Sequence, residues 1–135
     1  MRLLLDTHLL LWATAMSSRL PARARELLED ASNDVYCSAA SLWEIAIKSA
    51  LRRPDFDVDL KALRAALPEM AIAELPVTGQ HAEALSALPP IHKDPFDRLL
   101  VAQAKAEPLV LLTNDVLLEK YGDGVLVVGC AQTMS

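Results

Sequence analysis

The sequence predicts an α/β fold in which a mostly parallel β-sheet carries helices on both faces. Short aliphatic runs alternate with longer segments of helical periodicity along the whole chain. The first run, residues 3–5, contains only leucine, which is typical of a strand buried on both faces of a parallel sheet. Crossovers in such sheets are right-handed, so each helix is expected to pack back onto the sheet.

The first third of the chain supplies the expected central strand, residues 3–5, and two helices. One helix is predicted from residue 7 or 8 to residue 16. A second helix begins at Pro21, because proline suits the first helical turn. Its Leu27 and Leu28 are expected to face the core.

The middle of the chain continues the alternation. Residues 34–37 predict a strand, and a helix over residues 38–53 opens at a serine cap and ends before a proline. A polar connector over residues 55–59 precedes leucines spaced for a helix over 60–67, and residues 71–75 predict a short strand.

The last third repeats the pattern, and an Asp-Pro pair marks its main helix start. The expected segments are a helix capped by Thr78 (78–88), a stiff loop (89–93), a helix (94–107), a strand (109–112), a short helix capped by Thr113 or Asn114 and ending at residue 121, and a closing strand (125–128).

Length and composition limit the organisation of the protein. A chain of 135 residues suits one domain, taken as residues 1–135. Its apolar fraction of 53 % is slightly high, which hints at a surface covered by a partner subunit. The formal net charge of -5 excludes a protein that coats nucleic acid through bulk positive charge, although local basic groups can still hold a strand.

The N-terminus superficially imitates a secretion signal, but Asp6, Thr7 and His8 interrupt its apolar run. No later stretch is long enough to span a bilayer, so we expect a soluble protein with no membrane association. Cys37 and Cys130 are isolated, which predicts neither a zinc site nor a disulfide framework. A reducing cytoplasm is the simplest compartment.

Four acids, Asp6, Glu44, Asp97 and Asp115, stand where apolar runs give way to helix starts. In a sheet of this class such junctions gather along one edge, where ligands bind. Two carboxylates about 5 Å apart repel by roughly 3 kcal/mol at an effective dielectric constant of about 20. Four in one pocket therefore need shared protons or a cation, and the oxygen donors favour Mg²⁺ or Mn²⁺.

Each acid alone also has a structural explanation. Asp6 and Asp115 stand at positions that cap helices. Glu44 lies four residues before Lys48, the favourable order for a helical ion pair, and for this residue alone the structural explanation is the better one. Recurrence at one sheet edge is what favours a shared site.

Magnesium usually takes only one or two carboxylates directly. We therefore assign Asp6 and Asp97 as direct ligands and expect Glu44 and Asp115 to act through waters. A metal held in this way polarises a phosphoryl oxygen and lowers the pKa of its bound water, which is the chemistry of phosphodiester hydrolysis.

These segments resemble the PIN-domain ribonucleases, and among them the VapC-like toxins of bacterial toxin-antitoxin pairs. The resemblance covers almost the whole chain and rests on four fragments in order, residues 3–12, 38–48, 92–98 and 112–115. It implies a three-layer α/β/α sandwich, Mg²⁺- or Mn²⁺-dependent endoribonuclease activity on RNA, a homodimer, and silencing by a cognate antitoxin bound near the active site.

The resemblance also assigns roles to residues. Asp6, Glu44 and Asp97 match the three core acids of the family, and Asp115 matches the fourth, more variable one. Thr113 matches a small hydroxyl position that supports the pocket.

Neighbouring residues receive smaller roles. Thr7 is expected to orient the turn after the first strand. Arg98, beside an acid, is a possible contact for a substrate phosphate. Lys48, Arg52 and Arg53 form a basic stripe that suits RNA, although most such stripes are only solvated faces.

Asp94 is expected to cap a helix rather than bind metal, and His8 and His92 are expected to have no direct role. Three aromatic residues flank the acids and are expected to pack in the core or against a second subunit rather than stack on bases: Trp12, Trp43 and Phe96.

Other classes fit less well. A haloacid-dehalogenase-like phosphatase needs a second Asp where His8 stands, and a receiver domain needs an acidic pair and a late Lys that are not evident. Two alternatives stay open. One is a PIN-like nuclease of RNA processing or DNA metabolism without a toxin role, and the other is a binding module whose acids only cap helices.

Overall fold

A five-stranded sheet forms the centre of the computed structural model, which describes residues 1–129. The strand order is β3-β2-β1-β4-β5, and all four pairings are parallel. The all-leucine strand is central, as the sequence predicts. The strands are β1 (Arg2–Leu5), β2 (Asp34–Ser38), β3 (Ile72–Leu75), β4 (Val110–Thr113) and β5 (Val125–Val127).

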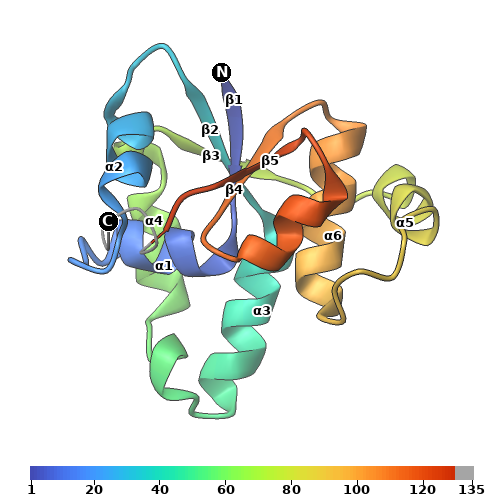
Figure 1. The fold of residues 1–135 in the computed structure, drawn as a ribbon. Helices are drawn as coiled ribbons and strands as arrows, with labels where there is room; N and C mark the ends of the chain where they lie inside the picture. The colour runs from blue at the N-terminus through green and yellow to red at the C-terminus, as the bar shows by residue number, and fades with distance from the viewer. Residues whose placement is uncertain (130–135) are drawn as a thin grey trace.

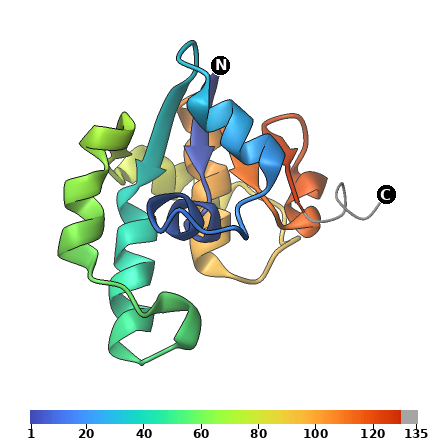
Figure 2. The same cartoon turned by 90° about the vertical axis from the view of Figure 1, so that its left-hand side faces the viewer.

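Helices cover both faces of the sheet and make three layers, which confirms the expected sandwich. In Figure 1, α1, α2 and α4 lie on one side of the strands, and α6 lies on the other with α5 outside it. Figure 2 looks onto the α1 and α2 side, with both helices in front of the sheet. The helices are α1 (Thr7–Thr14), α2 (Ala22–Glu29), α3 (Ala39–Ala50), α4 (Leu60–Ala66), α5 (Gly79–Ser86) and α6 (Pro95–Ala106), with shorter 3-10 segments η1 (Pro54–Phe56), η2 (Pro68–Met70) and η3 (Val116–Tyr121).

Strand β1 divides the core in two because its side chains alternate between the faces of the sheet. Leu3 and Leu5 belong to the cluster beneath α1, α2 and α4, whereas Leu4 belongs to the cluster beneath α6. All three leucines are fully buried. Burial on both faces is the reason that this strand is apolar at every central position.

The register brings the carboxyl ends of three strands together. Leu5 pairs with Cys37 of β2 and with Leu112 of β4. The chain leaves these strands directly into α1, α3 and the turn before η3. The polar residues that follow each strand therefore share one edge of the sheet.

Several boundaries differ from the sequence prediction by one to three residues; α1, for example, ends at Thr14 instead of residue 16. Helix α3 ends at Ala50 instead of residue 53, because Arg52 adopts a left-handed conformation with φ 57° and Arg53, before a proline, is extended. The last helical segment is 3-10, and Asp115 caps it in place of Thr113 or Asn114. Ala71 is also left-handed, so β3 begins one residue later than expected.

Within residues 1–129, no helix has both the length and the apolar character needed to cross a membrane.

Cys37 is a buried free thiol, and burial raises its pKa to about 12, so it is a packing residue and not a nucleophile. Cys130 lies outside the described residues.

Candidate active site

One cavity of about 290 Å³ at the carboxyl edge of the sheet brings the four acids together. Segments far apart in the sequence contribute to it, namely the ends of β1 and β4, the middle and last turn of α3, and the first turn of α6. The residues that line it are Asp6, Thr7, His8, Glu44, Lys48, Asp94, Asp97, Asn114 and Asp115.

Asp6 follows β1 and caps α1. Its Oδ1 accepts a hydrogen bond from the Leu9 backbone N–H at 2.8 Å, and its Oδ2 accepts one from the Thr113 hydroxyl at 2.5 Å. The residue is only 5 % exposed, and burial raises the pKa of its carboxyl although both hydrogen bonds oppose the rise. Thr113 thus ties β4 to the end of β1.

Glu44 lies on the buried side of α3, and each of its oxygens has a partner. Oε1 accepts from the Thr7 hydroxyl at 2.6 Å, and Oε2 accepts from the Lys48 ammonium at 2.6 Å. The predicted ion pair therefore exists inside the pocket. Thr7 was expected to orient the turn after β1, but its hydroxyl reaches Glu44 and links α1 to α3 instead.

Asp97 stands in the first turn of α6, where Asp94 caps the helix by accepting from the Phe96 backbone N–H at 2.8 Å. Burial, followed by the nearby charges of Asp94 and Asp6, raises the pKa of Asp97 to about 7. Among residues 1–129, no group donates a hydrogen bond to its side chain. His92 Nε2 lies 3.5 Å from Asp97 Oδ2.

Asp115 caps η3 and is also held on both oxygens. Oδ1 accepts from the Leu117 backbone N–H at 3.0 Å, and Oδ2 lies 2.8 Å from His92 Nε2. The nearest ligand atoms of His92, Asp97 and Asp115 all lie within 4.8 Å of one another. These three groups form the tightest set of potential metal donors among the residues that the structure describes.

His92 is the residue that sequence reasoning undervalued, because the structure places its imidazole among the acids. The available signal was its position, since it opens the third of the four family-like fragments, two residues before Asp94. Its contact with Asp115 spans 23 residues and could not be seen from local spacing.

The candidate phosphate contacts separate in the structure. Lys48 lines the acidic pocket, and its ammonium lies 4.9 Å from the centre of the Phe56 ring. Arg52 and Arg53 instead line a neighbouring hollow of about 580 Å³. Arg98 is outside the lining of both, and its Nε is buried without a hydrogen-bond partner in the described part of the chain.

The aromatic residues behave differently from one another. Trp12 is half-buried, and its ring centroid lies 5.8 Å from that of His8. Trp43 contacts Phe96 edge to face at 5.6 Å, yet Trp43 is 62 % exposed. Packing in the core is therefore wrong for Trp43, while packing against a second subunit stays a prediction.

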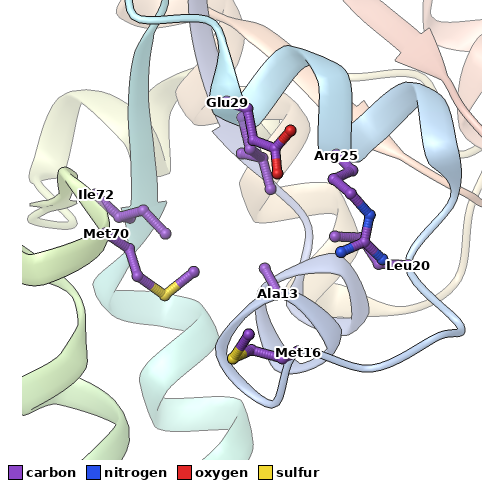
Figure 3. Close-up of a pocket in the computed structure, with 8 residues that line it drawn as sticks. Ala13, Met16, Leu20, Arg25, Glu29, Met70 and Ile72 are labelled. Carbon is purple, nitrogen blue, oxygen red and sulfur yellow. The ribbon is translucent and has the colours of Figure 1, made fainter.

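A separate apolar pocket of about 260 Å³ lies between the end of α1, α2 and the start of β3. Figure 3 shows Met70 and Ile72 on one side of it and Leu20 and Arg25 on the other, and Arg25 and Glu29 are the charged groups of its lining. It contains none of the four acids and no nucleophilic side chain. Within residues 1–129, Glu29 is the one carboxylate in its lining, so this pocket does not bring several carboxylates together as the acidic pocket does.

The donor set of the acidic pocket fits a hard divalent cation. Five carboxylates, the four acids and Asp94, line the pocket together with the ammonium of Lys48, so carboxyl groups outnumber this fixed positive charge. Protein donors fix the orientation of Asp6, Glu44 and Asp115, while Asp97 keeps both oxygens available. An oxygen-rich, pre-oriented and under-neutralised site of this kind suits Mg²⁺ or Mn²⁺.

Comparisons with known proteins agree with this geometry. The family model described as PIN domain matches residues 3–124. A comparison with curated proteins gives no match.

The solved structures that are similar to the chain include the following two. The crystal structure of VapBC2 from Rickettsia felis, bound to a DNA fragment from their promoter, matches at 14% identity and a TM-score of 0.66, over 96% of this chain and 98% of that chain. The crystal structure of FitAcB from Neisseria gonorrhoeae matches at 20% identity and a TM-score of 0.60, over 92% and 96%. At these identities the likeness establishes the fold.

Proposed function

The chain belongs to the PIN domain family, and on this premise we propose that it is a metal-dependent endoribonuclease that hydrolyses RNA phosphodiester bonds. The observation that carries the proposal is the convergence of Asp6, Glu44, Asp97 and Asp115 in one pocket. Helix caps alone would not require acids from four distant segments to face one cavity.

Asp6 and Asp97 are the proposed direct ligands of Mg²⁺ or Mn²⁺. Asp97 supports this assignment because a carboxylate with a pKa raised to about 7 and no protein donor gains most from a cation. Glu44 and Asp115 are proposed to act through waters, because Mg²⁺ usually takes only one or two carboxylates directly. Protein donors hold the oxygens of both, as they hold those of Asp6. When bound, the cation supplies polarisation of a phosphoryl oxygen and activation of water.

The protein groups around the acids keep this arrangement in place. Thr113 and the Leu9 N–H hold Asp6 from opposite sides, and Thr7 holds Glu44. Fixing the carboxylates before the substrate arrives lowers the cost of reorganising them during the reaction. Thr7 and Thr113 are therefore proposed as supporting residues.

We further propose that RNA enters along the basic end of α3. Lys48 lies in the acidic pocket, and Arg52 and Arg53 line the next hollow, one helical turn away. Phosphate oxygens bind such cations without regard to sequence. Arg98 neighbours Asp97 on α6, and this position alone supports it as a further proposed contact for a substrate phosphate.

A toxin role in the cytoplasm, with a cognate antitoxin as partner, is the biological setting that we propose. Both similar solved structures are toxin-antitoxin complexes. The four fragments of this chain that resemble VapC-like toxins add to that support. A small open reading frame directly upstream whose product suppresses the toxicity of this chain would bear out the proposal.

We also propose that the protein is a homodimer. Trp43, Ile47 and Leu51 follow one another at four-residue spacing along α3, and each is exposed, at 62 %, 37 % and 64 %. A helix in water rarely presents such a stripe without a partner. A second copy of the chain is the occupant that we propose for this face.

The first experiment compares RNA cleavage by the purified protein and by Asp6→Asn, with Mn²⁺ or with EDTA. We expect cleavage to require Mn²⁺ and to fall by about 100-fold or more in Asp6→Asn, the scale expected for losing a key charged group at a reacting centre. Asp123→Asn, an exposed acid outside the pocket, is the matched control.

Two results would contradict the proposal. Cleavage in the presence of EDTA would show that the reaction does not need a metal. Equal activity of Asp6→Asn and the unaltered protein would show that the acidic pocket is not the active site. Cleavage of DNA in place of RNA would favour the DNA-metabolism alternative. Absence of both saturable Mn²⁺ binding and cleavage would favour a binding module.

A further inference from the structure

We propose that His92 is a positioning residue of the acidic site: its neutral imidazole donates a hydrogen bond from Nε2 to Asp115, holds Asp115 beside Asp97, and does not itself ligate the cation. The inference rests on the proposed function and adds to it a residue outside the four acids.

The hydrogen-bond partners of His92 identify which ring nitrogen carries the proton. The backbone N–H of Asp94 points at Nδ1 over 3.0 Å, so Nδ1 accepts and carries no hydrogen. A neutral imidazole with Nδ1 unprotonated has its proton on Nε2. Nε2 is therefore a donor, and it lies 2.8 Å from Asp115 Oδ2.

The same assignment argues against His92 as a ligand. A nitrogen that carries a proton has no lone pair to give to a metal. Moving the proton to Nδ1 would set two N–H groups, those of His92 and Asp94, against each other. The backbone at the start of α6 therefore selects the donor form of the ring.

The ring also has little freedom to turn away. Its side chain is only 14 % exposed, and the backbone N–H of His92 donates to the Tyr121 hydroxyl at 3.0 Å. Tyr121 is itself buried in the core beneath α6. The histidine is thus attached to the start of α6, to η3 and to the core at once.

The position of His92 matters because Asp115 and Asp97 have few other hydrogen-bond donors. Leu117 fixes only one oxygen of Asp115, and no group within residues 1–129 donates a hydrogen bond to Asp97, whose Oδ2 lies 3.5 Å from His92 Nε2. A donor placed between two like charges keeps them from turning apart. Partners that orient metal-binding carboxylates in this way usually change metal affinity by about 10- to 100-fold when removed.

Two substitutions distinguish the hydrogen bond from His92 Nε2 to Asp115 from the hydrogen bond that His92 Nδ1 accepts from the Asp94 N–H. In His92→Gln the amide nitrogen replaces Nε2 and can still donate to Asp115. In His92→Asn the amide oxygen replaces Nδ1 and can still accept from Asp94, but the donor to Asp115 is lost. Each variant therefore serves as the control for the other.

Mn²⁺ affinity, measured by the electron paramagnetic resonance signal of free Mn²⁺, is the main readout. We expect His92→Asn to bind Mn²⁺ about 10- to 100-fold more weakly and His92→Gln to stay within about threefold of the unaltered protein. In His92→Asn the kcat for RNA at saturating Mn²⁺ should fall by a smaller factor than the Mn²⁺ affinity, because positioning acts chiefly through metal occupancy.

Several outcomes would overturn the proposal. Unchanged affinity in His92→Asn would leave His92 as a loop residue, and a large loss of kcat at saturating Mn²⁺ in His92→Gln would make it a catalytic group. Nitrogen coupling from a histidine to bound Mn²⁺ would make it a ligand. If a variant fails to fold, ¹⁵N spectra of the unaltered, metal-free protein still test the proposal, because they report the tautomer of the His92 imidazole. A proton on Nδ1 would contradict the proposed hydrogen bond from Nε2 to Asp115.

Failure of the proposed function looks different. If the unaltered protein neither binds Mn²⁺ nor cleaves RNA, the nuclease proposal fails and the positioning role falls with it. If the unaltered protein does both and the two variants behave alike, only the role of His92 is wrong.

Discussion

Asp6 and Asp97 show how two carboxylates in one pocket differ when only one of them has hydrogen-bond donors. Asp6 is more deeply buried, yet Thr113 and the Leu9 N–H each give one of its oxygens a hydrogen bond. Asp97 has no such donor and lies near the charges of Asp94 and Asp6. Its ionised form is therefore unfavourable in the metal-free protein.

The first residue-scale prediction concerns stability and pH. The pKa of Asp97 is raised from 3.8 to about 7, so between these values the folded protein holds a proton that the unfolded chain has released. Asp97 therefore lowers the free energy of unfolding progressively as pH rises from about 4 to 7, and the loss persists above that. Asp97→Asn should remove this loss of stability. In the absence of metal, the free energy of unfolding should rise by roughly 1–4 kcal/mol at pH 8 and by little at pH 4.

Urea unfolding in EDTA at the two pH values measures this effect, with Asp123→Asn as a control that should show neither change. The same Asp97→Asn variant should bind Mn²⁺ more weakly. A variant that is no more stable at pH 8, or that binds Mn²⁺ as well as the unaltered protein, would show that Asp97 only serves the start of α6.

The second residue-scale prediction concerns Thr113, which is fully buried. Thr113→Val keeps the shape of the side chain but leaves Asp6 without its donor, so the free energy of unfolding should fall by about 1–3 kcal/mol. Thr113→Ser keeps the hydroxyl and should retain Mn²⁺ binding. Equal Mn²⁺ affinity in both variants, measured by calorimetry, would show that this hydrogen bond does not support the site.

At the scale of elements, the helix starts and the acidic site are built from the same residues. Asp6 caps α1 and Asp115 caps η3, while Asp94 caps α6 one turn before Asp97. Glu44 likewise makes its helical ion pair with Lys48 inside the pocket. The structural explanation therefore holds for Asp6, Asp115 and Glu44, and the same three carboxylates line the pocket, so a structural role does not exclude a role in a shared site.

A prediction for α6 follows from its cap. Asp94→Ala removes the acceptor for the Phe96 N–H and should cost about 0.5–2 kcal/mol of stability. Both variants remove the charge that raises the pKa of Asp97, but only Asp94→Asn keeps an acceptor for the Phe96 N–H, so Asp94→Asn should be the more stable of the two at pH 8. Urea unfolding distinguishes them, and equal losses in both would show that the cap is not the source of the stability.

At the scale of the whole molecule, the order β3-β2-β1-β4-β5 decides which segments meet. Because β1 lies between β2 and β4, the ends of these three strands are neighbours, and α3 leaves the same edge. The outer side of α3 then carries the exposed stripe of Trp43, Ile47 and Leu51. The acidic site and the proposed dimer face thus share one helix.

The whole-molecule prediction tests that face. Leu51→Lys should shift the protein from dimer to monomer at micromolar concentration, because burying an unpaired charge in an apolar interface is unfavourable. Val77→Lys, at an exposed position in another segment, should leave the oligomeric state unchanged. Light scattering coupled to gel filtration measures the mass, and a monomer already present in the unaltered protein would exclude the dimer.

The order and type of the elements follow from the sequence alone, because they depend on local physics. Hydrophobic periodicity distinguishes strand from helix, and capping residues and proline mark the ends. The gathering of Asp6, Glu44, Asp97 and Asp115 also follows, since parallel strands end at one edge. The early end of α3 does not, because it depends on the left-handed backbone at Arg52.

Only the tertiary structure decides the contacts within the site. The bond from Thr113 to Asp6 spans 107 residues, that from Thr7 to Glu44 spans 37, and the contact of His92 with Asp115 spans 23. These hydrogen bonds form only when the packed helices and strands bring the two side chains to within hydrogen-bond distance. The spacing of residues along the sequence does not reveal that distance. The raised pKa of Asp97 has the same origin, because burial and the approach of distant charges exist only once the layers are assembled.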